Sequence, residues 1–182
     1  MGETVRRRWP LLLSVVLPTI PGRGDELERT IATYERLTPV AIEWIIERGH
    51  TNAGAAWNAG VARATGDILH ITADDLEPET AGWLPAALTV IAAGGVPLGW
   101  VYEHTNRFGR DFCRVPACRR EWWRDVPEIH YFSDNIWTDW MVRDGHPPTV
   151  ADGFDFVHRR SMVGRHEAEW MARDRAVYQS LQ

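Results

Sequence analysis

The sequence has little cysteine, no lysine and no long apolar run. Its two cysteines, Cys113 and Cys118, cannot form a disulfide scaffold, and no second pair elsewhere completes a metal site, so we expect reduced thiols in a cytoplasmic protein. All 20 basic residues are arginine, a bias from which we infer no function. No apolar stretch approaches the roughly 20 residues of a membrane-spanning helix, so we expect no membrane span.

The sequence also lacks an excess of positive charge. Its 25 acidic and 20 basic residues give a net charge of -5, which disfavours a surface devoted to nucleic acid. The apolar share of 45% is typical of a globular chain, and 182 residues predict a single domain over 1–182. The ten tryptophans suit stacking on sugars or bases as well as a core, where we expect most of them.

The first part of the chain alternates between two kinds of pattern. Short apolar runs are typical of buried parallel strands, and apolar residues at helical spacing, with Asp25 as a helix cap, predict helices between them. Strand, helix, strand, helix, strand predicts an α/β fold with a doubly wound, mainly parallel sheet flanked by helices. The predicted strands are 11–17, 41–46 and 67–72, and the predicted helices are 25–38 and 52–64.

The second part of the chain predicts more helices and a small antiparallel addition to the sheet. Four apolar residues fall on one face of the helix at 134–144, and we expect the last helix to be amphipathic. The predicted elements are helices at 80–93, 134–144 and 167–181, a strand at 154–158, and a hairpin whose strands 99–105 and 110–115 flank a turn at 106–109.

Polar residues gather where the predicted parallel strands end. The loops at 18–24 and 47–52 and the pair Asp74-Asp75 follow three successive strands. Ligands bind outside the carboxyl ends of such strands, so we expect a site there. Adjacent carboxylates are oxygen ligands for Mg²⁺ or Mn²⁺, ions that complete their shells with phosphates and water. The pair equally suits a helix cap and turn.

Several short segments, taken in order, carry a resemblance to a known family. They are 14–19 (SVVLPT), 27–31 (LERTI), 43–47 (EWIIE), 52–60 (NAGAAWNAG), 64–69 (ATGDIL) and 72–75 (TADD), followed by Ser133-Asp134, Arg143-Asp144-Gly145 and His158. In this order and spacing the sequence resembles a compact, non-processive family 2 glycosyltransferase of the GT-A type. The Gln-x-x-Arg-Trp motif of the processive members is absent.

The resemblance implies a GT-A-like fold and a separate role for each part of the chain. Residues 11–75 would bind the nucleotide, 76–160 would bind the acceptor and catalyse transfer, and 166–181 would form a C-terminal helix. The implied activity is metal-dependent, inverting transfer of a single sugar from a nucleoside diphosphate sugar to an acceptor hydroxyl, with Mn²⁺ or Mg²⁺ as cofactor. The acceptor (glycan, protein or modified nucleic acid) and the oligomeric state stay open.

The resemblance also assigns roles to individual residues. Asp74 matches the second aspartate of the Asp-x-Asp motif and would bind the metal ion together with Asp75 and His158. Asp134 matches the catalytic aspartate and would deprotonate the acceptor hydroxyl. The residues expected to bind the donor are Pro18, Thr19, Glu47, Asn52, Asn58, Thr72 and Asp74.

Structural interpretations of these residues stay open beside the functional ones. His158 also fits a surface histidine, Asp134 fits a helix cap, and Asn52 and Asn58 fit a closed turn and an exposed helix face. The arginines at 23, 159 and 160 fit either diphosphate clamps or a solvated surface. The tryptophans at 122, 123, 137 and 140 fit either sugar stacking or a core.

Two departures from the family pattern affect the functional hypothesis. Besides Trp57, which stands where the family has arginine, the chain is short for the family, with little between the second predicted strand and the segment 52–60. In addition, Thr72 replaces the first aspartate of the Asp-x-Asp motif. The loss of that carboxylate favours an alternative function, a degenerate glycosyltransferase that binds a nucleotide sugar or a glycan without turnover. A structural scaffold is a third class, which would bind neither metal nor nucleotide.

Overall fold

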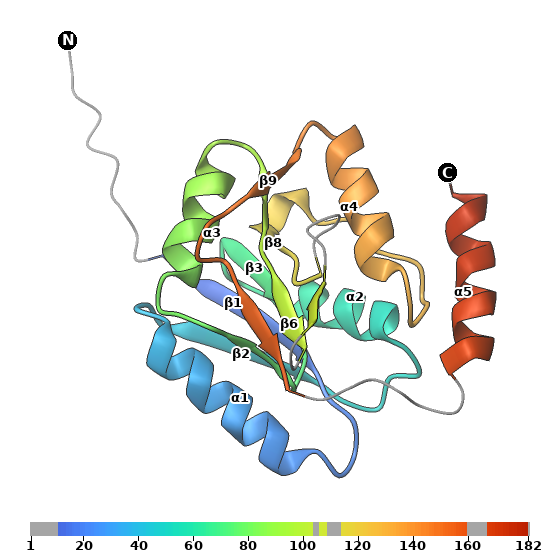
Figure 1. Cartoon of the computed structure of the whole chain (residues 1–182), viewed down its shortest axis with the longest axis horizontal. Helices are drawn as coiled ribbons and strands as arrows, with labels where there is room; N and C mark the ends of the chain where they lie inside the picture. The colour runs from blue at the N-terminus through green and yellow to red at the C-terminus, as the bar shows by residue number, and fades with distance from the viewer. Residues whose placement is uncertain (1–10, 104–105, 109–113, 160–166, 182) are drawn as a thin grey trace.

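The computed structural model describes residues 11–103, 106–108, 114–159 and 167–181 (Figure 1). Its first sheet has the strand order β2-β1-β3-β8. Strands β1 (Leu13–Pro18), β2 (Ile42–Glu47) and β3 (Ile68–Ile71) are parallel, and β8 (Ala117–Arg119) pairs antiparallel with β3. The doubly wound, mainly parallel sheet predicted from the sequence is confirmed.

Further short strands form a second sheet and a separate pair. The second sheet has the order β4-β10-β6-β7, and the separate pair joins β5 and β9. The strands are β4 (Leu76–Pro78), β5 (Val96–Leu98), β6 (Val101–Glu103), β7 (Asn106–Phe108), β9 (Pro148–Val150) and β10 (Phe156–His158). Antiparallel pairing of β4 with β10 and of β6 with β7 confirms the antiparallel addition.

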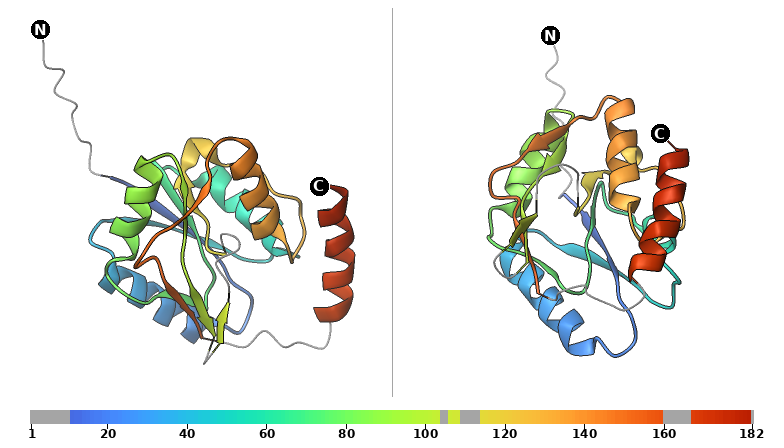
Figure 2. Two further views of the ribbon diagram at one scale, coloured as in Figure 1. Left: turned by 45° about the horizontal axis from the view of Figure 1, so that its top comes forward. Right: turned by 45° about the vertical axis from the view of Figure 1, so that its right-hand side comes forward.

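Helices cover both faces of the first sheet, as Figures 1 and 2 show. Helices α1 and α3 contribute to a core cluster on one face, and α2 and α4 contribute to a cluster on the other. In the described part of the chain no helix is long and apolar enough to cross a membrane. The helices are α1 (Gly24–Leu37), α2 (Ala53–Arg63), α3 (Trp83–Ala92), the short η1 (Arg120–Trp122), α4 (Ser133–Arg143) and α5 (Glu167–Ser180).

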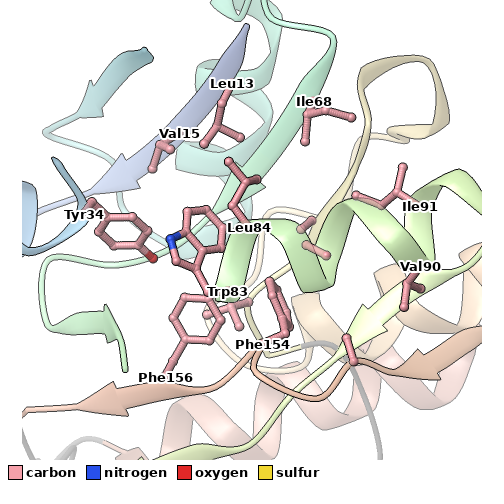
Figure 3. Packing of buried hydrophobic residues seen from close by; sticks show 14 of the residues in the cluster. Leu13, Val15, Tyr34, Ile68, Trp83, Leu84, Val90, Ile91, Phe154 and Phe156 are labelled. Atoms are coloured by element: carbon pink, nitrogen blue, oxygen red, sulfur yellow. The ribbon is translucent and has the colours of Figure 1, made fainter. Parts of the chain in front are cut away.

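Apart from Ser14, strand β1 is apolar because each of its faces meets a different core cluster. Side chains alternate across a strand, so Val15 points into the first cluster and Val16 into the second. Aromatic rings fill the first cluster, where Trp83 lies against Phe154 and Phe156 (Figure 3). The cluster of tryptophans considered for sugar stacking instead packs in or against the core, with Trp137 fully buried.

Three local expectations from the sequence were wrong. The residue at the N-cap of α1 is Arg23 and not Asp25, which lies in the first turn, where a carboxylate is favourable near the positive end of the helix dipole. The hairpin turn predicted at 106–109 is also wrong, because Asn106 already belongs to β7 and pairs with Glu103 of β6. Residues 104–105 and 109–113 lie outside the described part.

The third wrong expectation concerns α5, which is not amphipathic. The only buried residue among those of α5 whose side chains the structure describes is Asp174. Its carboxylate accepts hydrogen bonds from the backbone N–H groups of His130 and Tyr131 at 2.8 and 2.9 Å. In addition, the ring of Tyr178 stacks on Phe132, and its hydroxyl donates to Asp139. Polar and aromatic contacts therefore attach α5 beside α4 (Figure 2).

Close packing of α2 on β1 depends on Gly60. A Cβ at this position would lie 2.3 Å from a methyl group of Val16, which is fully buried. We expect Gly60→Ala to lower the free energy of unfolding by about 1–3 kcal/mol, because the buried side chain has little room to move. Gly24→Ala is the matched control, since a Cβ there meets no atom within 4 Å. Urea denaturation measures both, and equal stability of the two variants would contradict this account.

Candidate functional site

The carboxyl ends of β1, β2 and β3 meet at one edge of the first sheet. Pro18 is in register with Glu47, and the backbone N–H of Thr72 donates to the carbonyl of Val16. The β1–α1 loop at 19–24, Leu27 and Arg48 line an open cleft of about 340 Å³ at this edge. Its lining includes two arginines, Arg23 and Arg48, so the cleft is suited to an anionic ligand.

Two buried carboxylates lie beside this cleft. Asp74 and Asp75 follow β3 and are 1% and 3% exposed. Arg23 forms ion pairs with both of them, and the pair with Asp74 spans 2.6 Å. The hydroxyl of Thr19 also donates to Asp74, at 2.5 Å. A single guanidinium group, from a distant part of the chain, therefore pairs with two adjacent carboxylates.

Strand β10 of the second sheet brings His158 to the same carboxylates. The Nε2 atom of His158 lies 3.4 Å from Asp75, and the backbone N–H of Arg159 donates to the carbonyl of Asp75 at 2.9 Å. These contacts join residues more than 80 positions apart in the sequence. The structure thus brings His158 to Asp75, one of the two aspartates that the resemblance assigns, together with His158, to the metal ion.

The two carboxylates differ in their acidity. Burial raises the pKa of Asp74, and the hydrogen bond from Thr19 and the charge of Arg23 offset this only in part. Burial acts in the same direction on Asp75, but there the hydrogen bonds and charges of His158 and Arg23 outweigh it, so the pKa of Asp75 is below its usual value. Asp75 is therefore the more firmly ionised member of the pair.

The side chains of Asp74, Asp75 and His158 are suitable ligands for a hard divalent cation, although they do not form a complete metal site by themselves. Within the described residues, no three carboxylate, imidazole or thiol groups converge as a metal site. Mg²⁺ and Mn²⁺ commonly use only one or two protein carboxylates and take their other ligands from phosphates and water. The guanidinium of Arg23 is a cation already held by both carboxylates. Asp74 and Asp75, with His158 beside them, are thus suited to such an ion.

A buried polar network lies behind the carboxylates. The hydroxyl of Tyr34 donates to Thr72 at 2.8 Å and lies 2.8 Å from Nε2 of His70, and the hydroxyl of Thr72 donates to the carbonyl of Leu76. Burial lowers the pKa of His70 to about 3, so its ring is neutral at pH 7. The Thr72 hydroxyl is thus engaged inside the protein, and its contact with a donor stays a prediction.

Other residues predicted to bind the donor also have structural partners. Glu47 is buried and pairs with Arg63 and with His50, whose Nε2 lies 2.7 Å away. Asn52 caps α2 by accepting from Ala55, and Asn58 exchanges two hydrogen bonds with the backbone of Val126. The contact of Asn52 matches its structural interpretation, whereas the exposed helix face expected for Asn58 is wrong, because its side chain is partly buried against Val126. The role of Glu47, Asn52 and Asn58 toward a nucleotide stays a prediction.

Asp134 lies near the N-terminus of α4, apart from the carboxylate pair. Its Oδ1 accepts from the backbone N–H of Asn135 at 2.9 Å, although Phe132, in a left-handed conformation with φ of 66°, occupies the N-cap position. Burial raises the pKa of Asp134 to about 6, against the lowering effect of the Arg114 charge. Among the described residues, no recorded hydrogen bond or ion pair joins Asp134 to Asp74, Asp75 or His158.

Several residues of this region were not found by sequence reasoning. Tyr34 and His70 had no assigned polar role, because a tyrosine on an apolar helix face and a histidine in a strand give no pairing signal. Arg23 was identified only as a possible diphosphate clamp. Its ion pairs join residues about 50 positions apart, and no spacing rule connects them.

No protein-family model matches the sequence, and no curated protein sequence is similar to it. The fold is similar to that of several solved structures. A mannosyltransferase from Pyrobaculum calidifontis, in complex with GDP-Man and Mn²⁺, has a TM-score of 0.68 at 13% identity, over 94% of this chain and 65% of that chain. Glucosyl-3-phosphoglycerate synthase from Mycobacterium tuberculosis, with Mn²⁺, UDP and phosphoglyceric acid, has a TM-score of 0.63 at 18% identity, over 90% and 75%.

A further similar structure is that of S. aureus TarS in complex with UDP-GlcNAc, with a TM-score of 0.67 at 12% identity over 87% of this chain. The chain spans only 61% of that TarS chain and 65% of the mannosyltransferase. At these identities the likeness concerns the fold alone. With its mainly parallel β2-β1-β3 sheet, the antiparallel strand β8 and helices on both faces, the chain has the GT-A fold of nucleotide-sugar transferases.

Proposed function

We propose that the protein is a glycosyltransferase that moves a single sugar from a nucleoside diphosphate sugar to an acceptor hydroxyl, with inversion at the sugar carbon. The observation that carries this proposal is the buried Asp74-Asp75 pair beside an arginine-lined cleft, at the carboxyl edge of a GT-A sheet. Ligands of open parallel sheets bind at that edge. The solved structures that share this fold contain GDP-Man, UDP or UDP-GlcNAc.

The donor would occupy the cleft next to the β1–α1 loop. Arg23 and Arg48 line this cleft, and guanidinium groups bind phosphate oxygens in two-point fashion. Pro18, Thr19 and Glu47 lie at the ends of β1 and β2 and are proposed to contact the nucleoside. Asp74 and Asp75, with His158, would hold Mn²⁺ or Mg²⁺, which would supply positive charge for the departing diphosphate.

Asp134 is proposed as the general base. Its carboxylate would take the proton of the acceptor hydroxyl as the acceptor oxygen attacks the sugar carbon and the nucleoside diphosphate leaves from the opposite side. With a pKa of about 6, the group is largely ionised at pH 7 yet remains a better proton acceptor than an ordinary aspartate.

A second candidate function is a nucleotide-sugar or glycan binding module without turnover. The observation that favours it is Thr72, which replaces a carboxylate and whose hydroxyl is engaged by Tyr34 and Leu76. A module that binds a nucleotide sugar would use the same carboxylates as the transferase. They differ in whether Asp134 affects a reaction, so variants of Asp134 separate them.

Donor binding is tested by isothermal titration calorimetry with UDP, GDP and their sugars, with Mn²⁺ present. We expect Asp74→Asn to weaken Mn²⁺-dependent nucleotide binding at least tenfold, because a neutral amide is a poor ligand for a hard cation. Asp67→Asn is the control, since this exposed residue precedes β3 at the opposite end of the same strand. Equal nucleotide affinities of the two variants would remove the support for the proposed site.

The catalytic role of Asp134 is tested by sugar transfer. We expect Asp134→Asn to slow transfer by about 10²- to 10⁴-fold, the usual contribution of a general base, while nucleotide affinity stays within a few-fold. Asp144→Asn, at the other end of α4, should leave transfer unchanged. Asparagine keeps the Oδ1 atom that accepts from the backbone N–H of Asn135, so a purely structural role predicts normal transfer in both variants. That result would favour the binding module.

The raised pKa of Asp134 predicts a pH dependence. Below pH 6 the carboxyl is protonated and cannot accept a proton, so the turnover rate with saturating donor should rise with pH through about 6 and then level off.

The free energy of unfolding should change with pH in the direction opposite to the turnover rate. The folded state binds this proton more tightly than the unfolded state, so the free energy of unfolding should fall as pH rises from about 4 through 6. Asp134→Asn should abolish this part of the fall, as urea denaturation at several pH values would measure. An identical pH dependence of stability in both proteins would contradict the raised pKa.

A further inference from the structure

The contact between Arg23 and the two aspartates poses an electrostatic problem for metal binding. Arg23 lies within ion-pair distance of Asp74 and Asp75 at once, and both carboxylates are almost fully buried. A divalent cation that uses these carboxylates would meet the positive charge of the guanidinium at close range, in surroundings that screen charge poorly. The ion and the guanidinium therefore compete for the same carboxylate oxygens.

The local structure allows Arg23 to leave the carboxylates. Its side chain is 15% exposed, in contrast to the enclosed aspartates, and it lines the open cleft. Its backbone lies at the N-cap of α1 between two glycines, and Gly22 has a positive φ of 85°. Movement of the side chain toward the cleft thus requires no rearrangement of the core.

Arg23 also retains capacity to bind another anion. Its Nε atom is buried, and no described residue accepts a hydrogen bond from it. A buried N–H group without an acceptor is unfavourable, and a phosphate oxygen would satisfy it. The neighbouring cationic residues differ, since Arg29 and Arg159 are paired with Glu77. Arg23 alone among these three arginines contacts the Asp74-Asp75 pair in the recorded ion pairs of the described residues.

We propose that Arg23 is a displaceable counter-ion, which pairs with Asp74 and Asp75 in the metal-free protein and gives them up to a divalent cation when a nucleoside diphosphate offers it other anionic oxygens. This inference rests on the proposed function and adds a regulatory step at the same site. Displacement of Arg23 couples binding of the metal ion to binding of the nucleotide. The metal ion alone binds weakly, because it must displace Arg23 without compensation, and the nucleotide removes that obstacle. By linkage, each ligand raises the affinity for the other by the same factor.

The test measures Mn²⁺ binding without any nucleotide, from the electron paramagnetic resonance signal of the free ion. We expect Arg23→Gln to bind Mn²⁺ at least tenfold more tightly than the unmodified protein, because the carboxylates lose their internal cation. Arg29→Gln is the matched control. This variant removes an arginine of α1 that pairs with the buried carboxylate of Glu77. It leaves the ion pairs of Arg23 with Asp74 and Asp75 intact. Its Mn²⁺ affinity should equal that of the unmodified protein.

A second arm adds UDP or GDP to the same titrations, corrected for Mn²⁺ held by free nucleotide. The nucleotide should raise the Mn²⁺ affinity of the unmodified protein, and it should raise that of Arg23→Gln by a smaller factor. Arg23→Lys retains the charge without the two-point geometry and should have an intermediate Mn²⁺ affinity. This variant keeps the comparison available if Arg23→Gln does not fold, which circular dichroism would reveal.

The outcomes separate this inference from the proposed function. Mn²⁺ affinities that are equal in the unmodified protein and both Arg23 variants, or weaker in the variants, would overturn the counter-ion role. Tighter Mn²⁺ binding by the Arg23 variants, with no increase on adding nucleotide to the unmodified protein, would overturn the coupling. If no nucleoside diphosphate binds to any of the proteins with Mn²⁺ present, the proposed function fails, whereas the competition between Arg23 and Mn²⁺ is still decided by the first arm.

Discussion

The need to offset the charge of two adjacent buried carboxylates organises the candidate site of this protein. Asp74 and Asp75 are enclosed at the end of β3, and an isolated carboxylate in such surroundings is strongly unfavourable. The cation that meets this need comes from the β1–α1 loop, and a histidine comes from β10. One electrostatic requirement therefore fixes the first loop, the end of the central strand and the second sheet relative to one another.

The polar surroundings continue inward from this pair. Thr30 donates to the backbone carbonyl of Asp74, and Tyr34, one helical turn further along α1, joins His70 and Thr72. Helix α1 thus carries apolar packing and polar pairing on the same buried face. Thr72 removes one negative charge from the family pattern and gives a hydroxyl partner to Tyr34. Replacing that hydroxyl by a carboxylate would place a third negative charge near two carboxylates that share the single positive charge of Arg23.

The region of Asp134 is built on a different principle. The chain before α4 is held by backbone contacts with α2, where Gly54 donates to Ile129, and by the buried carboxylate of Asp174. Burial opposes the charge of Asp174, but the hydrogen bonds from Tyr131, Arg173 and His130 outweigh it and hold its pKa below the usual value. A charged side chain thus attaches α5 to the loop that positions Asp134, where an apolar contact would be the ordinary solution.

The sequence by itself determined the sheet, the order of its helices and the edge where the site lies, because these follow from short-range periodicity and from the rule that ligands bind beyond parallel strand ends. It also placed His158 with Asp74 and Asp75 through the resemblance. Only the tertiary structure decided how these residues are paired. The partners of Asp74, Thr72 and Asp174 come from segments 30 to 60 positions away, and their choice depends on which side chains meet when the sheets and helices pack. The polar and aromatic attachment of α5 was likewise decided by long-range contacts, which no local pattern of residues records.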